Sequence, residues 1–320
     1  RRRLPGCALP GAVAPVADGA ALAEAEALLL AVPAQTVRET CRALASHLAP
    51  GAPVALCAKG IELGTGRLLP EAVRKALPDR PVGVLSGPTF ADETAKGYPT
   101  AATIAFPFAE AERRAPEAAP AARLAVSLGS ESFRPYLSDD VTGVAVCGAM
   151  KNVIAIACGM MTGAGFAENT RAALVTRGLA EMGALAGALG GRRETLMGLA
   201  GVGDLTLSCS STHSRNMALG AQLGRGLARA ECFEGRPVVV EGEATARAIA
   251  GLAARAGVEL PICEAVRRIL HEGAPLAEAF AGLWARPIRA EALGLELALD
   301  HPSDADRKST RLNSSHTHLS

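Results

Sequence analysis

Two lysines stand inside apolar stretches of a chain that takes most of its positive charge from arginine. The 320 residues contain 5 lysines against 28 arginines, and apolar residues flank both Lys59 and Lys151. Burial lowers the pKa of a lysine because desolvation penalises its charged form, and a lysine that exchanges protons near neutral pH needs such a shift. The alternative is a buried stem whose ammonium group reaches the surface. Each lysine alone leaves both interpretations open.

A polar run at 208–216 combines a helix-start signal with groups that bind anions. Ser211 or Thr212 is expected to cap a helix, which leaves backbone N–H groups of the first turn free for an anion. The guanidinium of Arg215 and the amide of Asn216 would complete a site suited to phosphate. Ordinary capping is the alternative, and His213 alone is more often structural than catalytic.

The glycine-rich segment 198–204 is superficially similar to a dinucleotide-binding loop. It does not fit that motif, because no strand precedes it in a βαβ unit and its glycine spacing differs. We interpret it as a tight loop that presents Asp204 either to a substrate hydroxyl or to Lys151. A plain turn aspartate is the alternative.

The elements that must position these residues fall into two groups. The first group alternates short, continuous apolar runs with helical patterns, which indicates a parallel, doubly wound sheet covered on both faces. Its expected strands are 27–32, 53–58 and 81–86, its expected helices are 36–48 and 68–77, and 108–125 is expected to form a surface helix pair broken near Pro116 and Pro120.

The second group is helical throughout. Helices are expected at 141–161, at 168–189, from near Ser211, at 243–256 and at 261–272. The run 141–161 is long enough to span a membrane, but a lysine and an asparagine stand at its centre and its glycines allow close packing. It is therefore predicted to be the buried helix of a folded domain, not an integral membrane span.

Composition narrows the class of protein. The net charge of +1 and the aromatic content of 3% do not match a nucleic-acid-binding surface. The 8 cysteines are scattered singly without metal-ligand spacing, which indicates reduced thiols in a cytoplasmic protein and no metal site. The basic start lacks the apolar stretch of a signal peptide.

Eight motifs, in a fixed order, carry a resemblance to a known family. They are Ala31-Val32-Pro33, Lys59-Gly60, Ser86-Gly87-Pro88-Thr89-Phe90-Ala91, Lys151-Asn152-Val153-Ile154-Ala155, 169–178, 198–205, Ser214-Arg215-Asn216 and Val239-Val240-Glu241-Gly242. The series resembles that of bacterial NAD(P)-dependent glycerol-3-phosphate dehydrogenases, from about Leu4 to Glu291. Related dehydrogenases share the fold but not this set of motifs.

The resemblance implies an oxidoreductase that interconverts sn-glycerol 3-phosphate and dihydroxyacetone phosphate with NADPH or NADH and feeds glycerophospholipid synthesis. Hydride would pass between nicotinamide and C2 of this phosphorylated three-carbon substrate, while the catalytic residue Lys151 moves the proton on the C2 oxygen. The matched substrate contacts are Lys59, Gly87, Thr89, Lys151, Asp204, Ser214, Arg215 and Asn216. The matched cofactor contacts are Lys59, Ala91, Arg215, Val239 and Glu241.

The resemblance also implies a domain organisation. Residues 1–140 would be the C-terminal part of a Rossmann-type dinucleotide-binding domain and residues 141–300 a helical substrate domain. Residues 301–320 form a polar tail without periodicity, expected to be disordered and similar to translated sequencing-adapter sequence. The oligomeric state stays open, with a homodimer among the candidates.

The chain departs from the family at its start. The family begins with a strand, a GxGxxG loop, a helix and a second strand, and this chain starts after them. Because that loop cradles the cofactor pyrophosphate, we expect the chain as given to bind NAD(P)H poorly. The residue that distinguishes NADH from NADPH would also precede Arg1. Thr89 stands where many members have serine, which keeps the hydroxyl group.

Two alternatives remain at this point. One is another reductase of the same two-domain plan that acts on a different small 2-hydroxy or 2-oxo acid, although 214–216 favours a phosphate-bearing substrate. The other is a catalytically silent fragment or structural partner.

Overall fold

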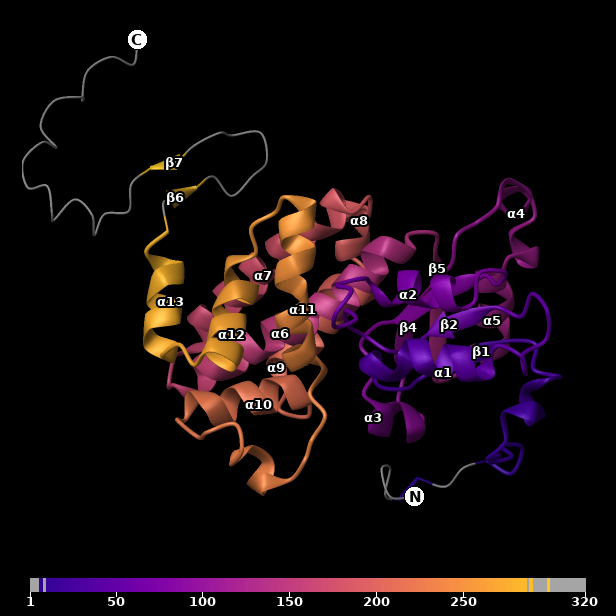
Figure 1. Ribbon diagram of the computed structural model, residues 1–320, viewed down its shortest axis with the longest axis horizontal. Coiled ribbons are helices and arrows are strands. Elements are labelled where there is room, and N and C mark those ends of the chain that lie inside the picture. Colours follow the sequence, from indigo (N-terminus) through magenta and orange to yellow (C-terminus); the bar gives the residue numbers. More distant parts are fainter. Residues whose placement is uncertain (1–5, 8–9, 287, 290–297, 300–320) are drawn as a thin grey trace, which may run out of the picture.

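A five-stranded sheet occupies the first half of the chain (Figure 1). The structure, a computed structural model, describes residues 6–7, 10–286, 288–289 and 298–299. The strands follow one another across the sheet in chain order: β1 (Leu28–Leu30), β2 (Val54–Leu56), β3 (Val82–Ser86), β4 (Thr100–Ala105) and β5 (Phe133–Ser138). The first three pair in parallel, as the sequence predicts for them, with Val54 opposite both Leu28 and Val82.

Strands β4 and β5 were not expected. β4 runs antiparallel to β3, and β5 runs parallel to β4, so the sheet is dominated by parallel pairs but is not wholly parallel. β4 consists largely of alanine and threonine and therefore lacks a long apolar run. β5 contains Pro135, which cannot donate to a strand ladder and is tolerated at the edge position that β5 occupies.

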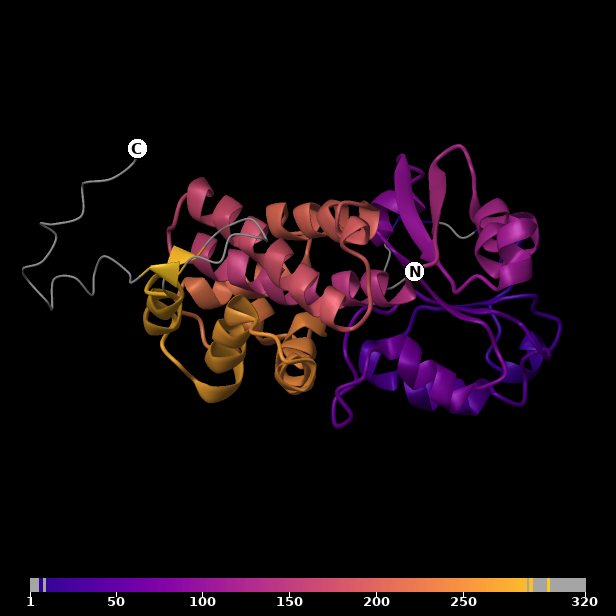
Figure 2. The ribbon, with the colours of Figure 1, turned by 90° about the horizontal axis from the view of Figure 1, so that it is seen from above.

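Helices cover both faces of this sheet (Figure 2). Val54 and Leu56 of β2 belong to the core that includes residues of α1 (Val37–Leu44) and α2 (Leu69–Ala76), whereas Ala55 packs in a second cluster with residues of α5 (Pro120–Leu128). The predicted helix at 68–77 is confirmed, and the one at 36–48 is shorter than expected.

The segment 108–125 differs from the expected surface helix pair. It contains α4 (Glu110–Arg114) and the start of α5, with a short 3-10 turn between them at Pro116–Ala118. The break occurs near the two prolines as predicted, but α5 buries Ala121 and Leu124 against the sheet. The short helix α3 (Ala91–Ala95) precedes β4.

The second half is built from helices, which Figure 1 shows beside the sheet. They are α6 (Val141–Gly163), α7 (Glu168–Ala188), α8 (Arg193–Leu196), α9 (Asp204–Ser210), α10 (Arg215–Gly224), α11 (Glu241–Ala256), α12 (Pro261–Glu272) and α13 (Leu276–Trp284). A pair of two-residue antiparallel strands, β6 (Ile288–Arg289) and β7 (Ala298–Leu299), follows these helices and was not predicted from the sequence. Strands this short leave no periodic pattern in a sequence. The expected tail at 301–320 lies outside the described residues.

Helix α6 forms the centre of the core, as its sequence predicts. Among the described residues it is the one helix long and apolar enough to cross a membrane, but that apolar stretch is wholly buried inside the protein. Its backbone lies directly against that of α10. The approach is so close that a Cβ on Gly159 would collide with the carbonyl of Met217, and a Cβ on Gly220 with the carbonyl of Ile156. Small residues on both helices therefore permit this close packing.

Candidate active site

The carboxylate of Asp204 bridges two lysines between the sheet and the helices. Its Oδ1 accepts a hydrogen bond from Lys151 Nζ at 2.5 Å, and its Oδ2 accepts one from Lys59 Nζ at 2.5 Å. Asp204 is 1% exposed and Lys151 8% exposed. Lys151 therefore does not extend its ammonium group to the surface. The sequence left Asp204 two possible partners, a substrate hydroxyl or Lys151, and the structure shows the contact with Lys151.

Burial shifts the proton affinity of Lys151. The pKa of Lys151 is lowered to about 8, chiefly because desolvation penalises its ammonium form and secondarily because Lys59 is close, while Asp204 opposes both effects. A group with this pKa is charged in most molecules at neutral pH and can still lose its proton readily. Such an amine suits the transfer of a proton to and from a reacting oxygen.

Helix α6 places Lys151 at this point. Asp140 caps the helix, since its Oδ1 accepts the Gly143 backbone N–H at 2.8 Å. Lys151 also donates to Ser208 Oγ at 2.9 Å. Ser208 was missed at the sequence level, although it follows Asp204 by four residues on α9 and so shares its helix face.

Asp204 is delivered by a helical turn, not by the tight loop that the sequence predicted. Residues Leu199–Gly203 form a π-helical turn, η4, that continues directly into α9. Gly201 is required there, because a Cβ on it would overlap the backbone of Leu196. Glycine therefore permits a compact helical turn whose backbone passes close to that of Leu196. In the sequence, closely spaced glycines suggest a loop, which is why this helical turn was not predicted.

The end of β3 supplies further candidates, Gly87 and Thr89. The Gly87 carbonyl accepts hydrogen bonds from Lys59 Nζ at 3.2 Å and from Thr89 Oγ1 at 3.3 Å. A Cβ on Gly87 would lie 2.9 Å from Ala102 Cα, so β4 leaves no room for a side chain. The structure thus brings Lys59, Gly87 and Thr89 together with the Asp204 cluster.

The start of α10 holds the candidates expected to bind phosphate. Ser214 caps this helix by accepting the Met217 backbone N–H at 3.4 Å, so the predicted cap at Ser211 or Thr212 is wrong by two or three residues. The intervening residues 211–214 form a turn in which Ser214 N donates to Ser211 O. Arg215 is the first residue of the helix and is exposed.

Asn216 is buried and connects three helices. Its Nδ2 donates to Asn152 Oδ1 at 2.9 Å, and its Oδ1 accepts the Gly242 backbone N–H at 2.9 Å. Asn152 directly follows Lys151 on α6, so this network fixes α10 and the start of α11 relative to the lysine. The sequence motif contains Asn152 but gave no signal that it pairs with Asn216.

Two of the cofactor candidates, Glu241 and Lys59, lie near the carboxyl ends of parallel strands. Glu241 Oε1 accepts the backbone N–H of Ala34, which follows β1, at 3.1 Å. Burial raises the pKa of the Glu241 carboxyl above its usual range, and the Ala34 N–H and Arg215 oppose that shift. Val239 is 54% exposed and Ala91 is exposed at the start of α3. In doubly wound folds, nucleotides bind at this edge of the sheet.

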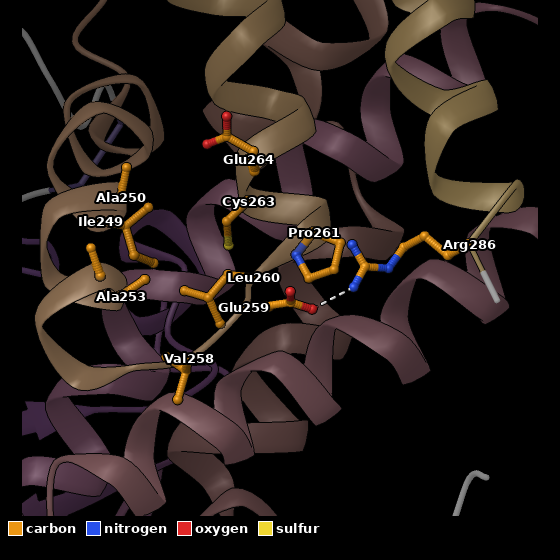
Figure 3. A pocket seen from close by; sticks show the side chains of 11 residues that line it. Ile249, Ala250, Ala253, Val258, Glu259, Leu260, Pro261, Cys263, Glu264 and Arg286 are labelled. Atoms are coloured by element: carbon orange, nitrogen blue, oxygen red, sulfur yellow. Dashed lines mark hydrogen bonds and ion pairs between the residues drawn. The ribbon is translucent and has the colours of Figure 1, made fainter. Parts of the chain in front are cut away.

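A separate cavity of about 340 Å³ lies in the helical half between α11, α12 and Arg286 (Figure 3). Its walls are largely apolar, and at its rim Glu259 pairs with Arg286 at 2.6 Å. None of the candidate site residues lines it. Throughout the described part of the chain, no three histidine, cysteine, aspartate or glutamate side chains group as a metal site requires.

The two halves of this chain match the two halves of one family. The profile described as "NAD-dependent glycerol-3-phosphate dehydrogenase N-terminus" matches residues 1–112, and its C-terminus counterpart matches residues 140–281. A protein of Caulobacter vibrioides named glycerol-3-phosphate dehydrogenase [NAD(P)+] is 46% identical over 289 residues, which cover 90% of this chain and 85% of that protein. The chain belongs to the NAD-dependent glycerol-3-phosphate dehydrogenase family.

Other members of this glycerol-3-phosphate dehydrogenase family show the same likeness. A Methylobacterium radiotolerans protein with the same name is 47% identical, covering 91% of this chain and 84% of its own. The crystal structure of glycerol-3-phosphate dehydrogenase from Coxiella burnetii is 35% identical, with a TM-score of 0.80, and covers 89% of this chain and 85% of that one. The fold class implied by the sequence motifs is therefore confirmed.

Proposed function

We propose that this chain is an NAD(P)-dependent oxidoreductase that interconverts sn-glycerol 3-phosphate and dihydroxyacetone phosphate. The observation that carries the proposal is the Lys151–Asp204–Lys59 cluster. The chain's relatives are named glycerol-3-phosphate dehydrogenase [NAD(P)+]. In the direction of reduction, its product feeds glycerophospholipid synthesis. The proposed location is the cytoplasm, and the proposed domain boundary lies between residues 140 and 141.

The chain's own residues account for proton transfer. Lys151 gives a proton to the C2 oxygen during reduction and takes it back during oxidation, while Asp204 holds the amine in place through a 2.5 Å bond. The ammonium group of Lys59 donates hydrogen bonds to the Asp204 carboxylate and to the Gly87 carbonyl. It places positive charge beside the C2 oxygen of the substrate. Thr89 and Asn216 are the proposed neutral contacts of the substrate.

Phosphate recognition is assigned to the start of α10. Ser214 and Arg215 lie where the helix leaves backbone N–H groups unpaired, and an anion is stabilised at such a helix end. The exposed guanidinium of Arg215 adds charge-assisted hydrogen bonds. This arrangement favours a phosphorylated substrate over an unphosphorylated one.

The residues present fit a nicotinamide cofactor at the sheet edge. Lys59, Ala91, Arg215, Val239 and Glu241 are the proposed contacts, and the bond from Ala34 to Glu241 brings the start of α11 to the end of β1. Bound NADPH or NADH would supply the hydride that reduces C2.

The direct test is turnover by the purified chain. With NADH or NADPH and dihydroxyacetone phosphate, the reduced cofactor should be consumed and glycerol 3-phosphate should appear, whereas dihydroxyacetone should react far more slowly. Faster turnover of an unphosphorylated 2-oxo acid would support the other-reductase alternative, which the names of the relatives do not favour. No turnover with saturating cofactor would contradict the proposed activity.

A further inference from the structure

An aromatic pair joins the two halves of the molecule beside the proposed substrate site. The rings of Phe90 and His213 lie 6.1 Å apart between centroids, at 65° to one another, in an edge-to-face arrangement. Phe90 comes from the segment that links β3 to α3, and His213 from the turn that links α9 to α10. Such pairs are favourable in this geometry and distance range.

Each ring is the chain neighbour of a proposed substrate contact. Phe90 follows Thr89, and His213 precedes Ser214. Neither ring is needed to fill the core, because Phe90 is half-buried and His213 is exposed. Their contact therefore links the two segments that carry Thr89 and Ser214 and contributes little to the burial of apolar surface.

The segment that carries Thr89 is held at two points. At its start, the Gly87 carbonyl is bonded to Lys59, which Asp204 of α9 binds in turn. At its end, Phe90 contacts His213, in the turn that follows α9. Thr89 lies between these two points, so both attachments connect it to the α9–α10 region that carries Ser214 and Arg215.

We infer that Phe90 and His213 form a clamp that sets the spacing between Thr89 and the start of α10, which makes His213 a positioning residue for the phosphorylated substrate. This inference rests on the proposed function. The clamp acts through the ring of His213 and not through its nitrogen atoms. It should affect how tightly dihydroxyacetone phosphate binds and not the proton transfer at Lys151, because the hydrogen bonds that hold the Lys151 amine come from Asp204 and Ser208.

Steady-state kinetics of four variants test the clamp. His213→Ala and Phe90→Leu should each raise KM for dihydroxyacetone phosphate about 2-fold to 10-fold, the range expected for loss of one aromatic pair. The value of kcat, the Kd of the cofactor and Tm should stay near those of the unmodified protein. The double variant should be no worse than the more impaired single variant, because the two rings act through one contact. His213→Phe should restore KM, since it keeps a ring and removes the nitrogens.

An NMR measurement separates failure of the clamp from failure of the proposed function. The imidazole protons of His213 should carry a ring-current shift that disappears in Phe90→Leu, whether or not the chain turns over. Absence of that shift would overturn the clamp and leave the activity unaffected. A His213→Phe variant as impaired as His213→Ala, or additive effects in the double variant, would also overturn it. Lack of turnover by the unmodified protein would count against the proposed function alone.

Discussion

At the scale of single residues, the structure explains why two lysines share one carboxylate. Two ammonium groups in a buried site repel each other, and Asp204 neutralises one of the two positive charges. Burial lowers the pKa of Lys151 most, Lys59 lowers it further, and Asp204 raises it. The balance leaves Lys151 with a pKa of about 8, which matches a group that must give and take a proton near neutral pH.

The variant Asp204→Asn tests that balance. Removing the negative charge removes an influence that raises the pKa of Lys151, so this pKa should fall below about 8. Reduction needs the protonated amine, so kcat for reduction should decline as pH rises through the pKa, and the decline should begin at lower pH in the variant. The pH profile of kcat measures this. An unmoved profile, or one displaced to higher pH, would contradict the proposed role of Asp204.

A second prediction at this scale concerns Arg215. Hydrogen bonds to a charged group contribute roughly 1.5–3 kcal/mol, so Arg215→Ala should lower kcat/KM for dihydroxyacetone phosphate about 10-fold to 150-fold. The value for dihydroxyacetone should change much less, because it has no phosphate. The matched control is Arg225→Ala, which removes an exposed arginine at the other end of α10. Equal losses for both substrates, with cofactor affinity intact, would show that Arg215 does not bind the phosphate.

At the scale of elements, local sequence predicts the long helices and the first three strands well. Helix α6 follows from an apolar run that begins after Asp140, and α12 begins at Pro261 and is followed by Gly273, as standard helix boundaries require. Strand β5 could not be predicted in this way, because Pro135 and its exposed side chains give it no apolar pattern. The turn at Leu199–Gly203 was mistaken for a loop because glycines there serve close packing.

The contact between α6 and α10 yields an element-scale prediction. Gly220→Ala should lower the free energy of unfolding by about 1–3 kcal/mol, because the new Cβ would collide with the Ile156 carbonyl. Gly187→Ala is the control, since Gly187 lies exposed in α7 and a Cβ added there would have no neighbour within 4 Å. It should leave stability unchanged or raise it by up to about 1 kcal/mol. Urea unfolding of both variants measures the difference, and equal effects would contradict the packing argument.

At the scale of the whole molecule, the site depends on residues that are far apart in the chain. Lys59 lies in the loop after β2, Lys151 on α6 and Asp204 at the start of α9, and only folding brings them within hydrogen-bond distance. Burial could be anticipated from the apolar residues around each lysine. Their convergence could not, because no local pattern encodes a distance between segments. The residues themselves left Asp204 open to Lys151 or to a substrate hydroxyl, and the family resemblance grouped all three as substrate contacts.

The same limit explains what sequence reasoning missed around the site. Asn152, Asn216 and the start of α11 form one network, yet each belongs to a different helix. The pairing of Phe90 with His213 likewise crosses between the sheet and the helices. Contacts of this kind depend on how the two halves pack, and the amino-acid types alone do not specify them.

The most direct test of the central claim is the kcat of Lys151→Met with dihydroxyacetone phosphate. Methionine keeps much of the volume of the lysine stem but has no proton to transfer, and Asp204 retains Lys59 as a partner. If Lys151 is the proton donor, kcat should fall by about 10²-fold to 10⁴-fold, the usual contribution of a positioned acid or base, while the Kd of the substrate changes far less. A kcat close to that of the unmodified protein would show that Lys151 is structural and that the proposed mechanism is wrong.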